Sequence, residues 1–211
     1  MKVPSENELI EHYGISNTTA RKILQEIENI GWVLRVKGKG TYVRTESIKR
    51  NVNRILGFTK NMIVAGYKPS TKVLDVNIVP RGYSILLNGR RYYMKEKTCR
   101  IKRLRYADNL PMMFETRHIS TSFCPNIETH DFTKSLYSIY EEDYGLTLSL
   151  INQMIRADVI TDKNLLELFG IQNSIPVLIV EGVTFCGKEM VLEIEKSIYR
   201  GDKYSFYVQA I

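Results

Sequence analysis

Two arginines and a glutamate near the middle of the sequence have the chemistry to bind an anion. Arg103 and Arg105 stand two residues apart in a strand-like run, so both side chains leave the same face of a sheet and can converge on one ligand. Planar guanidinium groups suit a phosphate or a carboxylate. Glu115, in the next strand-like run, could accept hydroxyl donors from a sugar while it orients an arginine. The alternative is a solvated cross-strand ion pair, which contributes little to stability.

The turn between these two runs decides whether Glu115 meets the arginines. A two-residue turn at Asp108-Asn109 would place Glu115 on the opposite face of the sheet, whereas a three-residue turn over 108–110 would place it across from Arg103. We predict the three-residue turn.

A second set of candidate residues lies in the first part of the sequence, within residues 4–43. Ser5 and Glu8 have the three-residue spacing of a helix capping box. Gly14 can end that helix in the left-handed conformation, and Ser16 can cap a second helix at once. Apolar residues recur in the second helix at three- and four-residue steps. The pattern predicts two short helices joined by a tight turn.

A basic hairpin is expected directly after these helices. Strand-like segments at 32–36 and 41–43 flank a tip of two lysines and two glycines at 37–40, so the whole segment is typical of a winged helix-turn-helix. Arg21 and the short polar side chains at the start of the second helix suit a major groove, where arginine can bond guanine bidentately. The wing would contact the DNA backbone or the adjacent minor groove. The alternative for Arg21 is an exposed helix charge.

The same segment carries a family resemblance. Val3-Pro4-Ser5-Glu6, 14–21, Gly31-Trp32 and 38–41 resemble the GntR family of bacterial transcription regulators. The resemblance implies a set of residues that face double-stranded operator DNA: Ser5, Glu6, Ser16, Asn17, Thr18, Thr19, Arg21, Gly38, Lys39 and Gly40. Asn17 stands where the family usually has an arginine, so one expected DNA contact is altered. The family also has a helix before Pro4, and the sequence starts only three residues earlier, so we expect a partial winged domain that lacks its first helix.

Composition bounds the class of protein. The 211 residues have room for one large or two modest domains, and we expect two. The net charge of +7 favours polyanionic partners. No apolar run approaches the roughly 20 residues of a membrane span and no signal peptide is present, so we expect a cytoplasmic protein without a membrane partner. The cysteines and histidines are scattered, so we expect no disulfide framework, no metal site and no cofactor.

The remaining sequence predicts an α+β fold with a mostly antiparallel sheet. We assign residues 1–44 to the winged domain, 45–53 to a linker and 54–211 to a second domain. Within the second domain the patterns predict helices at 55–63, 135–144 and 162–169, and strands at 73–79, 98–106, 112–120, 147–160, 177–186, 189–199 and 204–208. No local structure is assigned to residues 81–97.

The second domain resembles the UTRA effector domain, which accompanies the winged helix in the HutC subgroup of the GntR family. The resemblance rests on segments 69–71, 103–108, 135–137 and 199–204. UTRA domains adopt a chorismate-lyase-like fold, bind small molecules and dimerise. The resemblance therefore implies an effector pocket that includes Thr59, Arg103, Arg105, Glu115, Ser135, Tyr199 and Tyr204.

The expected function is that of a homodimeric repressor whose operator binding responds to a small anion, for example a sugar phosphate, because of the arginine pair. The alternatives are an enzyme and a stand-alone small-molecule-binding module, both with the chorismate-lyase-like fold. No serine, histidine or acidic residue lies in a recognisable nucleophile motif. We therefore assign no catalytic residue and do not expect an enzyme.

Overall fold

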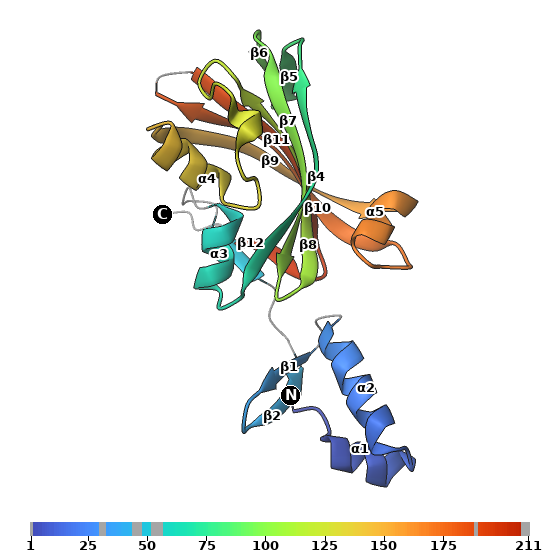
Figure 1. Ribbon diagram of the computed structural model, residues 1–211. Helices are drawn as coiled ribbons and strands as arrows, with labels where there is room; N and C mark the ends of the chain where they lie inside the picture. Colours follow the sequence, from blue (N-terminus) through green and yellow to red (C-terminus); the bar gives the residue numbers. More distant parts are fainter. Residues whose placement is uncertain (1, 30–32, 44–47, 52–56, 188–189, 208–211) are drawn as a thin grey trace. The chain divides into compact units, whose positions relative to one another are not determined.

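The computed structural model describes residues 2–29, 33–43, 48–51, 57–187 and 190–207 (Figure 1). The chain divides into two compact units, Met1–Glu46 and Ser47–Ile211, and each is described by itself. Residues 44–47 and 52–56 include much of the expected linker and lie outside the described residues, as do Gly31 and Trp32.

The first unit has the two helices and the hairpin that the sequence predicts. Its elements are α1 (Glu6–Tyr13), α2 (Asn17–Asn29), β1 (Val33–Val36) and β2 (Gly40–Val43). Ser5 and Glu8 form the predicted capping box at the start of α1, and Gly14 ends that helix with a φ of 63°. Ala20 and Leu24 of α2 are buried together with Val33 of β1, so the hairpin is part of the core of this unit.

The second unit is built on a six-stranded antiparallel sheet with the strand order β4-β7-β8-β11-β10-β9. The strands are β4 (Pro69–Val79), β7 (Thr98–Ala107), β8 (Leu110–Ser120), β9 (Leu148–Ile160), β10 (Ile175–Cys186) and β11 (Met190–Arg200). The helical elements are α3 (Phe58–Val64), η1 (Ile127–Thr129), α4 (Leu136–Ser138), η2 (Ile139–Asp143) and α5 (Lys163–Leu168). The predicted α+β class with a mostly antiparallel sheet is confirmed.

The sheet is covered on both faces, with α3 and α4 on one side and α5 on the other (Figure 1). Ile101 of β7 packs in one core cluster with Leu136 of α4, whereas Leu104 packs in another cluster with Leu166 of α5. The alternation of side chains along a strand explains this division, because residues at odd and even positions point to opposite faces. Side chains on the α3–α4 face are the ones that form the candidate site below.

Residues 81–97, to which the sequence analysis assigned no structure, contain a hairpin. Its strands are β5 (Tyr83–Leu87) and β6 (Arg90–Met94), joined by a turn at Asn88-Gly89 in which both residues have positive φ. Asparagine followed by glycine is the preferred sequence of such a turn, so the signal was present in the sequence. Met94 packs in one cluster with Val183 of β10. The hairpin therefore covers the same face of the sheet as α5.

Two further expectations differ from the structure. Residues 48–51 of the expected linker form β3 (Ile48–Asn51), which pairs in parallel with β12 (Tyr204–Tyr207), so this segment belongs to the second unit. The expected helix over 135–144 begins with only three α-helical residues and continues as a π-helix, η2. Ser135 caps its start, since its hydroxyl accepts a hydrogen bond from the Ser138 amide.

Candidate functional site

Glu115 lies opposite Arg103 in the β7–β8 ladder, as predicted, although the turn that brings it there is shorter than predicted. The turn has two residues, Asp108 and Asn109, with φ values of 47° and 67°, as a type I′ turn requires. The ladder then shifts register by one residue between Arg105 and Tyr106. The predicted three-residue turn is therefore wrong, and a β-bulge in β8 supplies the extra residue that brings Glu115 to the arginine face.

Three arginines converge on the Glu115 carboxylate. Arg103 Nη2 lies 2.5 Å from Glu115 Oε1, and Arg105 Nη1 lies 3.1 Å from the same oxygen. Arg117 pairs with the second carboxylate oxygen, because its Nη2 lies 2.7 Å from Glu115 Oε2. All four side chains are buried. This arrangement excludes the alternative of a solvated surface ion pair.

The two predicted arginines also hold neighbouring segments in place. Arg105 Nη2 donates to Thr59 Oγ1 of α3 at 2.8 Å, and its guanidinium lies 4.8 Å from the centre of the Phe58 ring. Arg103 Nη1 donates to the main-chain carbonyls of Phe132 and Lys134, each at 3.2 Å. The arginine pair thus ties the first turn of α3 and the segment before α4 to the sheet.

Further buried charged residues, which the sequence analysis did not predict, lie behind Glu115 and its arginines. Arg117 Nη1 lies 2.5 Å from Glu193 Oε1, and Arg117 Nη2 lies 2.9 Å from Glu195 Oε2. Tyr140 donates its hydroxyl to Glu193 Oε2 at 2.6 Å. The signal was in the sequence, because Arg117 follows Glu115 by two residues and Glu193 precedes Glu195 by two, which places each pair on one face of an apolar strand.

Burial and ion pairing together set the protonation of this cluster. Burial would raise the pKa of Glu115, but the neighbouring arginines outweigh it and hold that pKa well below its usual range. Burial lowers the pKa of Arg103 to about 10, against the opposing effect of Glu115. Both groups are therefore charged at neutral pH. Burial raises the pKa of Glu193, which makes it the more easily protonated carboxyl.

A small cavity opens next to the arginine pair, with a volume of about 20 Å3. Five of the seven predicted effector residues line it: Thr59, Arg103, Arg105, Ser135 and Tyr199. Glu115 lies behind the arginines, and Tyr204 lies behind Tyr199 with ring centres 4.6 Å apart. A volume of this size holds about one water molecule. The site is therefore closed in this arrangement.

Each arginine of the pair keeps an unused donor. Within the described residues, the buried Nε atoms of Arg103 and Arg105 have no hydrogen-bond partner. Buried donors are almost always paired, so two unpaired guanidinium N–H groups in one site are unusual. Both belong to residues that line the cavity, which gives it the chemistry to bind an anion.

The described residues show no group of three or more His, Cys, Asp or Glu that could hold a metal ion. They also include no helix long and apolar enough to span a membrane.

In the first unit, one carboxylate joins two exposed arginines. Glu6 Oε2 of α1 lies 3.4 Å from Arg21 Nε of α2, and Glu6 Oε1 lies 3.1 Å from Arg35 Nη2 of β1. The side chains of Arg21 and Arg35 are 68% and 42% exposed, whereas that of Glu6 is 24% exposed. Glu6 therefore orients the arginines of the second helix and the first wing strand. The sequence analysis did not single out Arg35.

The other predicted DNA-facing residues divide into two groups. The hydroxyls of Ser5 and Ser16 accept hydrogen bonds from the amides of Glu8 and Thr19, and Ser16 also bonds to the Thr19 hydroxyl at 2.8 Å. These three side chains therefore build the helix starts. The remaining predicted residues form an exposed or half-exposed set: Asn17, Thr18, Arg21, Gly38, Lys39 and Gly40.

The wing has the backbone that its glycines require. Gly38 and Gly40 have φ values of 77° and 112°, and the Lys39 amide donates to the Val36 carbonyl at 2.9 Å. Side-chain-bearing residues rarely adopt such φ values. The turn thus presents Lys39 at an exposed tip.

Comparison with known protein families agrees with both units. Residues 64–205 match the UTRA domain, and residues 1–43 match the bacterial regulatory proteins of the gntR family. The chain belongs to the GntR family of transcription regulators. Its combination of a winged helix and a UTRA domain is the HutC-type architecture. In GntR regulators of this type the first unit binds DNA and the UTRA domain binds small-molecule effectors.

Individual relatives support the same classification of this GntR regulator. The HTH-type transcriptional repressor NagR of Bacillus subtilis (strain 168) is 29% identical over 209 residues, which cover 98% of this chain and 84% of NagR. The HTH-type transcriptional regulator TreR of the same organism is 24% identical over 97% of this chain and 85% of TreR. The crystal structure of PhnF from Mycobacterium smegmatis has a TM-score of 0.68 at 20% identity, covering 99% of this chain and 91% of PhnF.

Proposed function

We propose that this GntR regulator is a homodimeric repressor whose binding to operator DNA is controlled by a small anionic metabolite, such as a sugar phosphate. The observation that carries the proposal is the buried pair Arg103 and Arg105, whose guanidinium groups border a closed cavity and each keep an unpaired donor. Planar guanidinium forks suit phosphate and carboxylate groups. That chemistry favours an anion over a neutral ligand.

The position of Ser135 also favours an anion. Ser135 lines the same cavity as the arginine pair and caps the start of α4. The two guanidinium groups and the Ser135 hydroxyl together offer donors for several oxygens of one ligand. Glu115 fixes the arginines in place, because both its oxygens already accept charged donors.

Effector binding can act on DNA binding through α3. An anion that binds Arg105 competes with Thr59 Oγ1, which now accepts from that guanidinium. An anion that binds Arg103 competes with the carbonyls of Phe132 and Lys134. Because the cavity is closed, ligand entry must move α3 or the segment before α4. Of these two segments, α3 lies nearer along the chain to the connection between the two units, so we assign it the coupling role.

In the DNA-binding unit, we assign base or phosphate contacts to Arg21 and Arg35, and a positioning role to Glu6. A carboxylate facing DNA phosphates would be repelled, whereas one that holds two arginines leaves a net positive group. Thr18, Asn17 and the wing at 38–40 complete the proposed surface. Operator binding also requires access to the chromosome, which places the protein in the cytoplasm.

An enzyme with this fold is the less favoured function. NagR and TreR are named as transcription regulators, and the charged residues of the buried cluster bond mainly to one another. A turnover assay on any ligand that binds would separate the two functions.

A thermal-shift screen tests the proposed effector class. Hexose phosphates, the parent hexoses and small carboxylates are each added to the wild type and to Arg103→Ala, and every shift is compared with the same variant without ligand. We expect a rise in melting temperature that needs the phosphate and is lost in Arg103→Ala. Arg100→Ala, which removes an arginine of β7 paired with Asp75 instead, should keep the response.

Arg103→Lys is a second variant that keeps the test valid if Arg103→Ala does not fold. It keeps the charge but loses the bidentate fork, so it should fold and still bind the ligand more weakly. Equal shifts with hexoses and their phosphates would contradict the proposed effector class and leave DNA binding untouched.

A further inference from the structure

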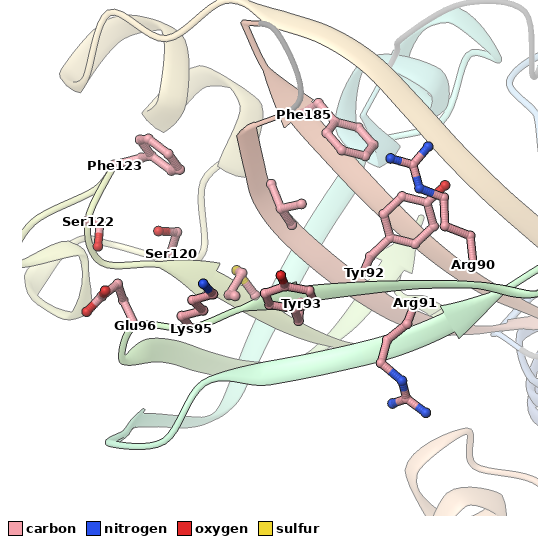
Figure 2. Close-up of a pocket in the computed structure, with 12 residues that line it drawn as sticks. Arg90, Arg91, Tyr92, Tyr93, Lys95, Glu96, Ser120, Ser122, Phe123 and Phe185 are labelled. Atoms are coloured by element: carbon pink, nitrogen blue, oxygen red, sulfur yellow. The ribbon is translucent and has the colours of Figure 1, made fainter.

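A second cavity has a volume of about 410 Å3 (Figure 2). Its lining residues Met94 and Phe185 pack with Val183 on the α5 face of the sheet, opposite the arginine pair. It is bordered by β6, by the facing ends of β10 and β11, and by the segment that follows β8. It shares no lining residue with the Arg103–Arg105 cavity. Pockets for small molecules typically have volumes of about 300–1,000 Å3, so this cavity has room for a ligand.

One wall of this cavity is apolar and aromatic. Phe185 and Met94 are buried, and the Tyr92 ring stands edge-on to Phe185 with ring centres 5.9 Å apart. Asn152 of β9 donates its side-chain amide to the Tyr92 hydroxyl at 3.4 Å, so the tyrosine is held from a different strand. A planar ring placed here would meet aromatic edges and faces, which is the contact that aromatic groups prefer.

The other wall is mainly cationic, although the Glu96 carboxylate also lines the cavity. The Arg90 guanidinium lies 5.1 Å from the centre of the Tyr92 ring, and the Lys95 ammonium lies 5.7 Å from the centre of the Tyr93 ring. Among the residues that the structure describes, neither Arg90 nor Lys95 forms an ion pair. Arg100, by contrast, is paired with Asp75 at 2.9 Å. The cavity thus combines cations that lack a carboxylate with rings on which a ligand can stack.

We propose that this cavity binds a small aromatic anion, a planar ring that carries a carboxylate or a phosphate. The ring lies against Tyr92 and Phe185, and the anionic group pairs with Arg90, whose guanidinium already stacks on Tyr92. Neither half of the ligand suffices, because an inorganic anion would leave the apolar wall unused and a neutral ring would leave the cations unpaired. This ligand is distinct from the effector proposed for Arg103 and Arg105.

Nuclear magnetic resonance of isotope-labelled methionine methyl groups tests the proposal at the level of the site. Met94 lines the cavity, whereas Met113 packs in a core cluster with Tyr199 beside the other site. The probes are phenyl phosphate and phenylacetate, with inorganic phosphate and benzyl alcohol as the separated halves. We expect both aromatic anions to shift the Met94 resonance saturably and to leave Met113 unchanged. The resonance is assigned with Met94→Leu.

Two arginine variants supply a matched comparison. Arg91 also lines the cavity, but its side chain points away from Tyr92 and Phe185 (Figure 2), and its Nη1 lies 3.4 Å from Ser84 Oγ. Arg90→Ala should weaken binding about tenfold, the loss of one good polar contact, while Arg91→Ala removes the same charge and should change affinity less than about twofold. Both residues are exposed, so both variants should fold.

Three results would overturn the proposal. One is a Met94 resonance that stays unmoved by either aromatic anion at millimolar concentration. Another is an equal loss of affinity in Arg90→Ala and Arg91→Ala. The third is binding that shifts Met113 and disappears in Arg103→Ala, which would assign the aromatic anion to the other site.

Discussion

Arg103 on β7 and Glu115 on β8 meet at 2.5 Å with side chains that are only 2% and 0% exposed. An ion pair so deeply buried costs desolvation energy, and replacing a buried pair by apolar residues is often neutral or stabilising. Fold stability alone therefore does not explain why three arginines surround one carboxylate here. The proposed binding role would explain it, because the cluster holds guanidinium groups at the edge of a cavity.

Glu115→Gln should destabilise the protein strongly. The change leaves three buried arginines around an uncharged amide, and breaking a buried pair on one side costs about 3–5 kcal/mol. Urea unfolding at neutral pH measures the loss. Glu181→Gln is the matched control, because Glu181 pairs with Lys196 at 3.8 Å in a partly exposed site and should lose less than about 0.5 kcal/mol.

The same variant predicts a pH dependence. The pKa of Glu115 is held below its ordinary value of 4.5, so its contribution to stability is present above that pH and is lost as the pH falls below it. The stability difference between the wild type and Glu115→Gln should therefore shrink as the medium is acidified below this value. A difference that stays constant with pH would mean that Glu115 is not ionised in the folded protein.

His118 should destabilise the fold in acid for a separate reason. Burial, with a smaller effect of Arg100, lowers its pKa from 6.5 to about 4, and its ring stacks on Tyr83 with centres 3.6 Å apart. The unfolded chain then binds the proton first, so the free energy of unfolding should fall by on the order of 3 kcal/mol as the pH drops between these two values. His118→Phe keeps an aromatic ring and should flatten this dependence. A ring that titrates near 6.5 in the folded protein would contradict the argument.

Arg35→Ala should weaken operator binding and reduce its salt dependence. If Arg35 contacts a phosphate, the slope of log affinity against log salt should fall by about one unit, with a similar loss on operator and random DNA. Arg21→Ala should instead remove most of the preference for the operator over random DNA and leave effector affinity unchanged. Fluorescence anisotropy with operator duplexes selected from a random pool measures both.

Glu6→Gln tests whether Glu6 positions Arg21 and Arg35 for operator recognition. The variant loses a negative charge near DNA, so binding to random DNA should tighten, while the preference for the operator should fall because Arg21 and Arg35 lose their shared anchor. Glu11→Gln removes an exposed charge from the same helix and should leave the preference unchanged. If both variants behave alike, the two contacts of Glu6 have no role in recognition.

Thr59→Val should uncouple effector binding from DNA binding. The valine is close in shape but cannot accept the hydrogen bond that Arg105 now donates at 2.8 Å. The hydrogen bond from Arg105 to α3 is then already absent and only the contact with the Phe58 ring remains, so an effector should bind as tightly as before or more tightly but change operator affinity less. Ser135→Ala provides the comparison, since it removes a hydroxyl from the cavity without touching α3.

The sequence predicted that Arg103, Arg105 and Glu115 come together, but not the backbone geometry that brings them together. Alternating positions in apolar strands placed Arg103 and Arg105 on one face, and that rule is local. The bulge that brings Glu115 to this face is not visible in residue types, because the two-residue turn at Asp108-Asn109 and the longer turn are both compatible with the sequence. Arg117 and Glu193 obey the same alternation and could have been found by asking which charges interrupt an apolar strand.

Other differences between the sequence-based predictions and the structure arise from contacts between residues that are distant in the chain. The parallel pairing of β3 with β12 joins residues 48 and 204, which no local pattern reveals. The small volume of the cavity depends on how the α3 and α4 segments pack on the sheet. The hairpin at 83–94 is the opposite case, because Asn88-Gly89 is a strong turn signal that was present in the sequence.

In the proposed regulation, an anion held by Arg103 and Arg105 changes operator binding. The most direct measurement is the anisotropy of a labelled operator complex during titration with hexose phosphates, carried out in parallel with wild type, Thr59→Val and Arg100→Ala. We expect one phosphorylated ligand to change operator affinity in the wild type and in Arg100→Ala, its parent hexose to leave that affinity unchanged, and the response to be smaller in Thr59→Val. An unchanged operator complex with a ligand that demonstrably binds at Arg103, or an equal response in all three proteins, would contradict it.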